Sequence, residues 1–86
     1  MKRLQFFMFE ACPYCQKAMR LMEELKRENP AYAAIAMETI DEKKDPVTAD
    51  RYDYWYVPSF FVDGKKLHEG DITKEEMKKI YQAALE

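Results

Sequence analysis

The sequence lacks the features of several classes of small protein. Its 86 residues include two cysteines and one histidine, and the acidic residues outnumber the basic ones, which gives a net charge of −2. A nucleic-acid surface needs a basic stripe, and two closely spaced cysteines cannot staple distant parts of a secreted mini-protein. No apolar stretch approaches the length that spans a membrane. We therefore expect neither nucleic acid nor a membrane as a partner.

The N-terminus resembles an export signal only superficially. Met1-Lys2-Arg3 is basic, but the apolar run at 4–9 is short and is closed by Glu10. We therefore expect a cytoplasmic protein, in a reducing setting where a nearby pair of cysteines cycles between thiol and disulfide. Because the chain is short and has no repeat or linker, we expect residues 1–86 to form a single domain that acts as a monomer.

The chain does contain one chemically distinctive stretch, Cys12-Pro13-Tyr14-Cys15. Residues 16–29 have a helical pattern, which predicts that Cys12 lies at a helix N-terminus. Unpaired N–H groups and the helix dipole stabilise an anion there, and such a position lowers the pKa of a cysteine. Two intervening residues on the first turn bring the sulfurs close enough to bond while only the first sulfur stays exposed. The stretch predicts a thiol–disulfide redox site.

Hydrophobic periodicity predicts the other elements of an α/β fold. Strands are expected at 2–9, within 31–40, at 59–62 and at 65–68, and helices at 16–29, at 47–54 and after residue 73. Asp63-Gly64 suits a two-residue type I′ turn, and Thr73 with Glu76 forms a capping box. The order βαβαββα indicates a four-stranded mixed sheet flanked by three helices on both faces. The long connection between the first two strands makes that pair parallel.

Two motifs resemble a known family. Cys12-Pro13-Tyr14-Cys15 is identical to the active-site tetrapeptide typical of glutaredoxins, and Val57-Pro58 resembles the second landmark of the thioredoxin superfamily. The resemblance covers nearly the whole chain and implies a thioredoxin-like fold in which Cys12 is the nucleophile and Cys15 the resolving thiol. It also implies a thiol–disulfide oxidoreductase that acts on protein disulfides or glutathione mixed disulfides and has no bound cofactor.

The resemblance also implies a substrate-binding surface around the cysteines. Val57 would offer its backbone N–H and C=O to an extended peptide or to glutathione, next to a cis Pro58. The other residues expected at this surface are Pro13, Tyr14, Gly70 and Asp71.

The electron donor stays open between two alternatives. Glutaredoxins commonly carry a Gly-Gly pair after the hairpin, where this chain has His68-Glu69 and a single Gly70, a pattern closer to thioredoxins. Glu10 stands where glutaredoxins tend to have a basic residue and would oppose a glutathione carboxylate. Glutathione as co-substrate and a flavoprotein of the thioredoxin reductase type are both compatible with the sequence.

The same cysteines allow a second class of function, a metal-binding or partner-docking module. Cys12, Cys15 and His68 supply three ligands, whereas structural zinc usually takes four. An iron–sulfur cluster shared between two chains is known for some relatives, usually with a smaller or more open tetrapeptide. A static bridge or a pair of core cysteines would make Pro13-Tyr14 an odd insert. We therefore predict no metal ligand and keep the module as the alternative.

Aromatic residues gather immediately before Val57. Tyr52, Tyr54, Trp55 and Tyr56 cannot all fit a core this small. We expect Tyr52 to be buried and Trp55 or Tyr56 to lie at the rim of the active site, where an aromatic surface suits a protein partner. The alternative is that every second member packs under the second helix.

Overall fold

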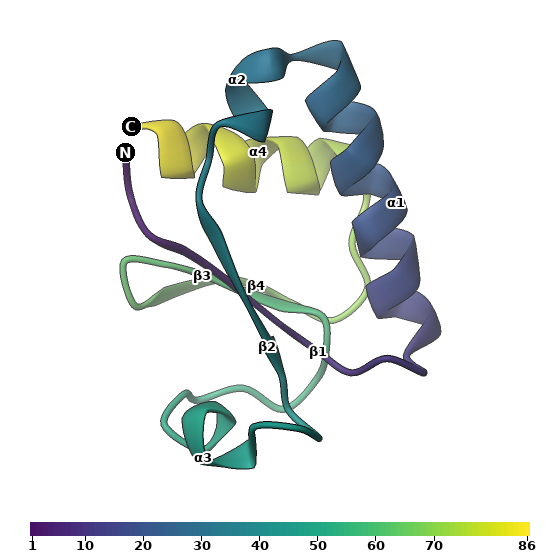
Figure 1. The fold of residues 1–86 in the computed structure, drawn as a ribbon, viewed down its shortest axis with the longest axis vertical. Coiled ribbons are helices and arrows are strands. Elements are labelled where there is room, and N and C mark those ends of the chain that lie inside the picture. The colour runs from purple at the N-terminus through teal and green to yellow at the C-terminus, as the bar shows by residue number, and fades with distance from the viewer.

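The computed structural model describes all 86 residues. The elements in chain order are β1 (Leu4–Met8), α1 (Pro13–Glu28), α2 (Pro30–Ala33), β2 (Met37–Asp41), α3 (Pro46–Ala49), β3 (Ser59–Val62), β4 (Lys65–Glu69) and α4 (Lys74–Leu85) (Figure 1). The strands form one sheet in the order β2-β1-β3-β4, with β1 parallel to β2 and antiparallel to β3. None of the helices combines the length and the apolar character that crossing a membrane requires.

The central strand β1 divides the core into two clusters. All five of its residues are buried, and successive side chains point to opposite faces of the sheet. Leu4, Phe6 and Met8 belong to the larger cluster, which includes residues of α1, α2 and α4. Phe7 belongs to the smaller cluster together with Ala49 of α3. Helices thus cover both faces, as predicted, with α3 on the side opposite α1 and α4 (Figure 1).

Local sequence signals account for the helix ends and the hairpin. The capping box predicted at Thr73 and Glu76 is present at the start of α4. Asp63 and Gly64 both have positive φ angles, of 49° and 80°, as the type I′ turn between β3 and β4 requires. α4 buries one apolar face, formed by Met77, Ile80, Tyr81 and Ala84.

The prediction of a helix over 47–54 is wrong beyond its first turn. α3 ends at Ala49, after a turn in which the Asp45 carboxylate accepts the N–H of Thr48 at 3.2 Å. Tyr52 and Tyr54 then both pack on Phe7 of the sheet, with ring centroids 4.8 and 4.9 Å away. Two side chains that are two positions apart share a face in extended backbone and not in a helix. Packing of the tyrosines on the sheet therefore prevails over the helical pattern.

The predicted second strand also begins later than expected. Asn29 ends α1, and its side chain accepts the N–H of Ala31 at 3.1 Å, which starts the extra one-turn helix α2 at Pro30. Tyr32 on this turn is buried and stacks on Tyr81 of α4, with ring centroids 5.0 Å apart. β2 therefore starts at Met37, and the structure has four helices rather than three.

Candidate active site

Cys12 occupies the N-cap of α1, directly after the loop that follows β1. Its Sγ accepts the backbone N–H of Cys15 at 3.1 Å, and Pro13 fills the first helical turn, where no N–H donor is required. Both cysteines are free thiols. The two sulfurs thus lie on a single turn at the positive end of a 16-residue helix.

The expectation that Cys12 is exposed is wrong. The residue is 4% exposed and belongs to the larger apolar cluster, as does Cys15, which is fully buried. The hydrogen bond from the Cys15 N–H turns the Cys12 sulfur back onto the helix instead of outward into solvent. The sequence places the thiol at the helix end correctly but does not reveal this inward orientation.

The buried position of Cys15 changes the ionisation of its thiol. Burial and, next in size, the hydrogen bond with the Cys12 thiol raise the pKa of the Cys15 thiol to about 12. Cys15 is therefore protonated at neutral pH, which suits a thiol that reacts second.

We expect Cys15 to be nearly inert toward iodoacetamide in a Cys12→Ser variant at neutral pH. Only the thiolate reacts. Because the pKa of Cys15 is raised, its alkylation rate should still increase with pH in the range where the rate of an ordinary cysteine has become constant. The rate should be measured by mass spectrometry across the alkaline range, with the same variant in denaturant as control. A rate in the folded variant that levels off at the same pH as in the denatured control would contradict the buried position of Cys15.

Val57 and Pro58 lie directly before β3. The Val57–Pro58 peptide bond is cis, Pro58 is buried, and Val57 packs against the same cluster that contains Cys12. The Pro58 C=O accepts the N–H of Gly70 at 2.8 Å, whereas neither the N–H nor the C=O of Val57 takes part in a hydrogen bond. The backbone of Val57 therefore has a free hydrogen-bond donor and a free acceptor.

The loop after β4 is held by internal contacts. Gly70 has a φ angle of 91°, which favours glycine, and its N–H is already bonded to Pro58. The Asp71 carboxylate accepts two hydrogen bonds, from the Lys17 ammonium at 3.0 Å and from the backbone N–H of Ile72 at 2.9 Å. The ion pair with Lys17 holds the pKa of Asp71 below its usual range. The structure thus joins this loop to α1 near the cysteines.

Glu69 has a role that the sequence did not reveal. Its carboxylate accepts the backbone N–H groups of Trp55 and Tyr56, and Lys66 pairs with the other oxygen at 2.7 Å. These contacts hold the pKa of Glu69 below its usual range, and the hydrogen bond from Lys66 has the largest effect. Because the bonded residues are 13 and 14 positions away, no local pattern could have identified the contact. Glu69 fixes the segment that leads into Val57.

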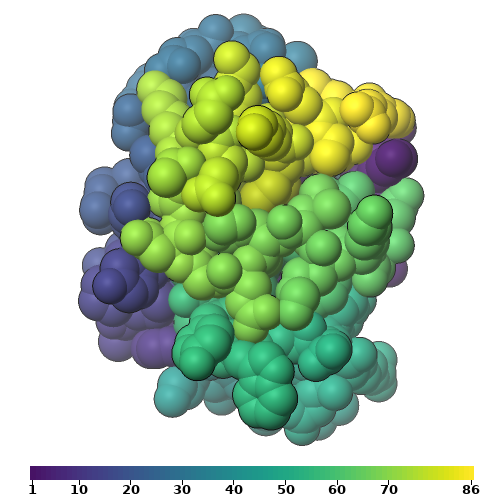
Figure 2. Space-filling model, turned by 180° about the vertical axis from the view of Figure 1, so that it is seen from behind, coloured from purple at the N-terminus to yellow at the C-terminus, as the bar shows by residue number.

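The aromatic residues before Val57 divide into two pairs. Tyr52 and Tyr54 are half-buried on the sheet, so that Tyr52 is less buried than expected. Trp55 is 84% and Tyr56 71% exposed, and Tyr14 of the tetrapeptide is 55% exposed. Seen from behind, the teal segment around residues 50–57 forms the surface below β4 (Figure 2). Trp55 and Tyr56 are thus exposed, as predicted for side chains at a rim. Tyr52 and Tyr54, which are two positions apart, pack inward as the alternative predicted.

His68 is in contact with the loop after β4 and forms no hydrogen bond with either cysteine. Its Nε2 is 2.7 Å from the Asp71 carbonyl oxygen, and its Nδ1 is 3.7 Å from the Glu76 carboxylate. No group of three or more histidine, cysteine or acidic side chains is arranged to hold a metal ion. Glu10 is likewise engaged, since its carboxylate pairs with Lys44 at 3.5 Å.

Comparisons with known proteins match this geometry to one family. The family model described as "Thioredoxin domain" matches residues 4–82. A protein named thioredoxin from Methanocaldococcus jannaschii is 32% identical over 73 residues, which cover 85% of this chain and 84% of that protein.

Solved structures show the same fold at low identity. The oxidised thioredoxin of Plasmodium falciparum superposes with a TM-score of 0.70 at 14% identity, over 95% of this chain and 79% of that one. A structure titled as a malarial protein gives a TM-score of 0.74 at 13% identity, over 100% and 99% of the two chains. Two cysteines on the first turn of a helix, in this fold, are the arrangement of a thiol–disulfide oxidoreductase. The chain belongs to the thioredoxin-domain family.

Proposed function

We propose that the protein reduces disulfides of other proteins through Cys12 and Cys15 and is itself reduced by a flavoprotein of the thioredoxin reductase type. The observation that carries this proposal is the Cys12 sulfur at the N-cap of α1, where it accepts the Cys15 N–H at 3.1 Å. An anion at this position is stabilised by the helix end, so that Cys12 is the better nucleophile of the two.

The proposed reaction has two exchange steps. The Cys12 thiolate attacks one sulfur of the substrate disulfide, forms a mixed disulfide and releases the other substrate sulfur as a thiolate that takes up a proton. Cys15 then loses its proton and attacks the Cys12 sulfur, which forms the Cys12–Cys15 disulfide and releases the second substrate thiol. Two electrons pass from the pair to the substrate, and the reductase restores both thiols.

Val57 is the proposed anchor for the substrate backbone. Its unbonded N–H and C=O can pair with an extended peptide in the manner of an added β-strand. The exposed side chains of Tyr14, Trp55 and Tyr56 provide further apolar area for a protein partner. A monomer in a reducing compartment such as the cytoplasm is the setting that we propose for this cycle.

Internal contacts in the loop after β4 favour the reductase over glutathione as the electron donor. The N–H of Gly70 is bonded to Pro58, and the N–H of Ile72 is bonded to the Asp71 carboxylate, so neither is free to bind a glutathione carboxylate. The relative from Methanocaldococcus jannaschii, named thioredoxin, supports the same choice.

A Cys15→Ser variant tests the choice of donor. It keeps Cys12 and the N–H at position 15 but can act only by a single-thiol route. We expect no turnover of a glutathione mixed disulfide with this variant, whereas the wild-type protein reduces a protein disulfide when a flavoprotein reductase or a chemical dithiol supplies electrons. Turnover with glutathione by the variant would overturn the proposed donor. Failure of the wild-type protein to reduce any disulfide would overturn the proposed function.

A further inference from the structure

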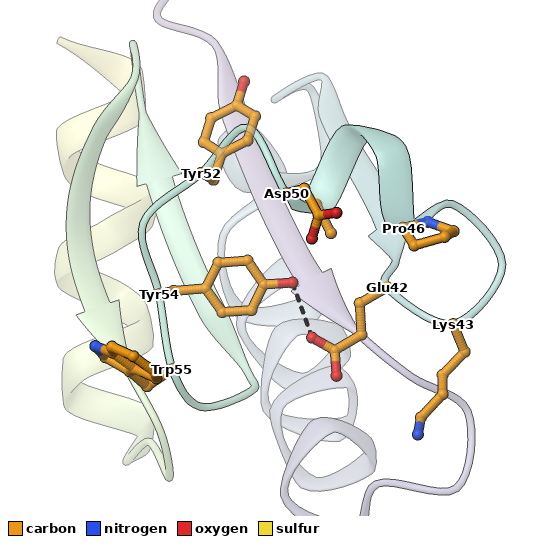
Figure 3. Close-up of a pocket in the computed structure, with 8 residues that line it drawn as sticks. Glu42, Lys43, Pro46, Asp50, Tyr52, Tyr54 and Trp55 are labelled. Atoms are coloured by element: carbon orange, nitrogen blue, oxygen red, sulfur yellow. Dashed lines mark hydrogen bonds between the residues drawn. The ribbon is translucent and has the colours of Figure 1, made fainter.

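A hollow of about 390 Å³ lies on the face of the sheet that carries α3 (Figure 3). Its walls come from the end of β2, from α3 and from the segment that leads to Val57. Glu42, Asp50, Tyr54 and Trp55 are among the residues that line it. Trp55 is two positions before Val57, so the hollow is close to the proposed anchor of the substrate backbone.

Two carboxylates, those of Glu42 and Asp50, line this hollow, and one of them is bonded to a hydroxyl group. The Tyr54 hydroxyl donates to the Glu42 carboxylate at 2.8 Å (Figure 3). Burial raises the pKa of Tyr54, and so do its hydrogen bond with Glu42 and the charges of Glu42 and Asp50. Lys43 also lines the hollow, so its wall carries two carboxylates and one ammonium, a net negative charge.

Neither of these carboxylates is neutralised by an ion pair. The other acidic side chains around the active site each have a lysine partner: Glu10 pairs with Lys44, Glu69 with Lys66 and Asp71 with Lys17. Glu42 and Asp50 take part in no ion pair of the structure. The one lysine that lines the hollow, Lys43, forms no ion pair, and its ammonium lies 5.0 Å from the centre of the Phe9 ring.

Trp55 gives an independent indication that something binds here. Its backbone N–H is held by Glu69, yet its indole is 84% exposed at the edge of the hollow. A large apolar side chain on a fixed backbone is available for contact at little cost in ordering. An aromatic face beside two carboxylates suits a cation, because the ring quadrupole and the negative charges attract the same group.

We propose that this hollow is a binding site for a lysine or arginine side chain of the substrate protein, located in the peptide segment that flanks the reacting cysteine. The inference rests on the proposed function, since it assumes a protein disulfide bound at Val57. It adds a preference among substrates: protein disulfides with a basic residue beside the cysteine are reduced faster than those with an acidic one.

A set of peptide disulfides that differ in one flanking residue tests the preference. Arginine, norleucine or glutamate is placed at successive positions on either side of the cysteine, and kcat/KM is measured at low ionic strength. At the best position, we expect the arginine peptide to exceed the glutamate peptide by about tenfold, the size of a partly exposed ion pair combined with a cation–π contact. The ratio should shrink as salt is added.

Conservative variants connect the preference to the hollow. Glu42→Gln with Asp50→Asn should reduce the arginine-to-glutamate ratio to about twofold or less, while the norleucine peptide changes little. Asp53→Asn is the matched control, because Asp53 is exposed on the same segment and does not line the hollow. It removes one negative charge, against two in the double variant, and should preserve most of the ratio. Comparing ratios within each variant cancels any effect on the cysteines themselves.

Trp55 fluorescence supplies a readout that does not depend on turnover. It is the single tryptophan of the chain, so its emission reports the hollow directly. In a Cys12→Ser variant, the arginine peptide should change the emission at lower concentration than the glutamate peptide. Equal rates and equal emission changes for all peptides would overturn the binding site and leave the proposed function standing. Lack of reduction of every peptide, norleucine included, would count against the proposed function itself.

Discussion

Replacing Cys12 by serine is expected to lower disulfide reduction by on the order of 10⁴-fold or more, the range seen when an enzyme loses its nucleophile. The hydroxyl cannot form the mixed disulfide, and Cys15 cannot replace the lost thiol because it is fully buried and its pKa is raised to about 12. The fold should survive, since serine is a favoured N-cap residue whose oxygen can accept the Cys15 N–H. The rate of reduction of a defined protein disulfide, with far-ultraviolet circular dichroism as the check on folding, measures the effect.

The Cys15→Ser protein is the matched control for this experiment, because it also loses one thiol from the same turn. It should still attack the substrate and accumulate as a mixed disulfide, which mass spectrometry detects, whereas Cys12→Ser protein should form none. If the Cys12→Ser protein instead accumulated the adduct, the two roles would be reversed and the assignment of Cys12 as nucleophile would be wrong.

Elements with strong local signals could be predicted from the sequence. β1 is a short apolar run, the α4 capping box is a four-residue pattern, and Asp63-Gly64 specifies its own turn. Cys12-Pro13-Tyr14-Cys15 likewise indicates where the thiols lie, because proline and the helix that follows fix the first turn. In each case, the residues that determine the conformation are neighbours along the chain.

The features that the sequence did not predict depend on contacts between distant residues. α3 is short because Tyr52 and Tyr54 pack on Phe7 of β1. Phe7 is far away in the sequence, so the spacing of the two tyrosines alone does not reveal this contact. Glu69 bonds to two amides that precede it by more than a dozen residues. The burial of Cys12 similarly depends on the direction of its sulfur and on the cluster around it, which no spacing of residues encodes.

Replacing Phe60 by alanine is expected to lower the free energy of unfolding by about 3–5 kcal/mol, the usual cost of truncating a fully buried phenylalanine. Phe60 is completely buried on β3 and stacks on Phe6 of β1, with ring centroids 4.9 Å apart and an interplanar angle of 12°. The free energy of unfolding of a small domain is about 5–15 kcal/mol in total, so the variant should lose a large share of its stability. Urea unfolding followed by circular dichroism measures it, since the exposed Trp55 is a poor probe of the core.

Tyr56→Ala is the matched control for this core substitution, because it truncates another aromatic side chain four positions earlier that is 71% exposed. Its effect on the free energy of unfolding should stay within about 0.5 kcal/mol, while binding of a protein substrate weakens. Phe60 belongs to the cluster against which Val57 packs, so its truncation removes apolar support from the segment that presents Val57. We therefore expect the folded fraction of the Phe60→Ala protein to show a raised KM for protein disulfides. Loss of less than 1 kcal/mol would mean that the aromatic stack between β1 and β3 does not hold the two strands together.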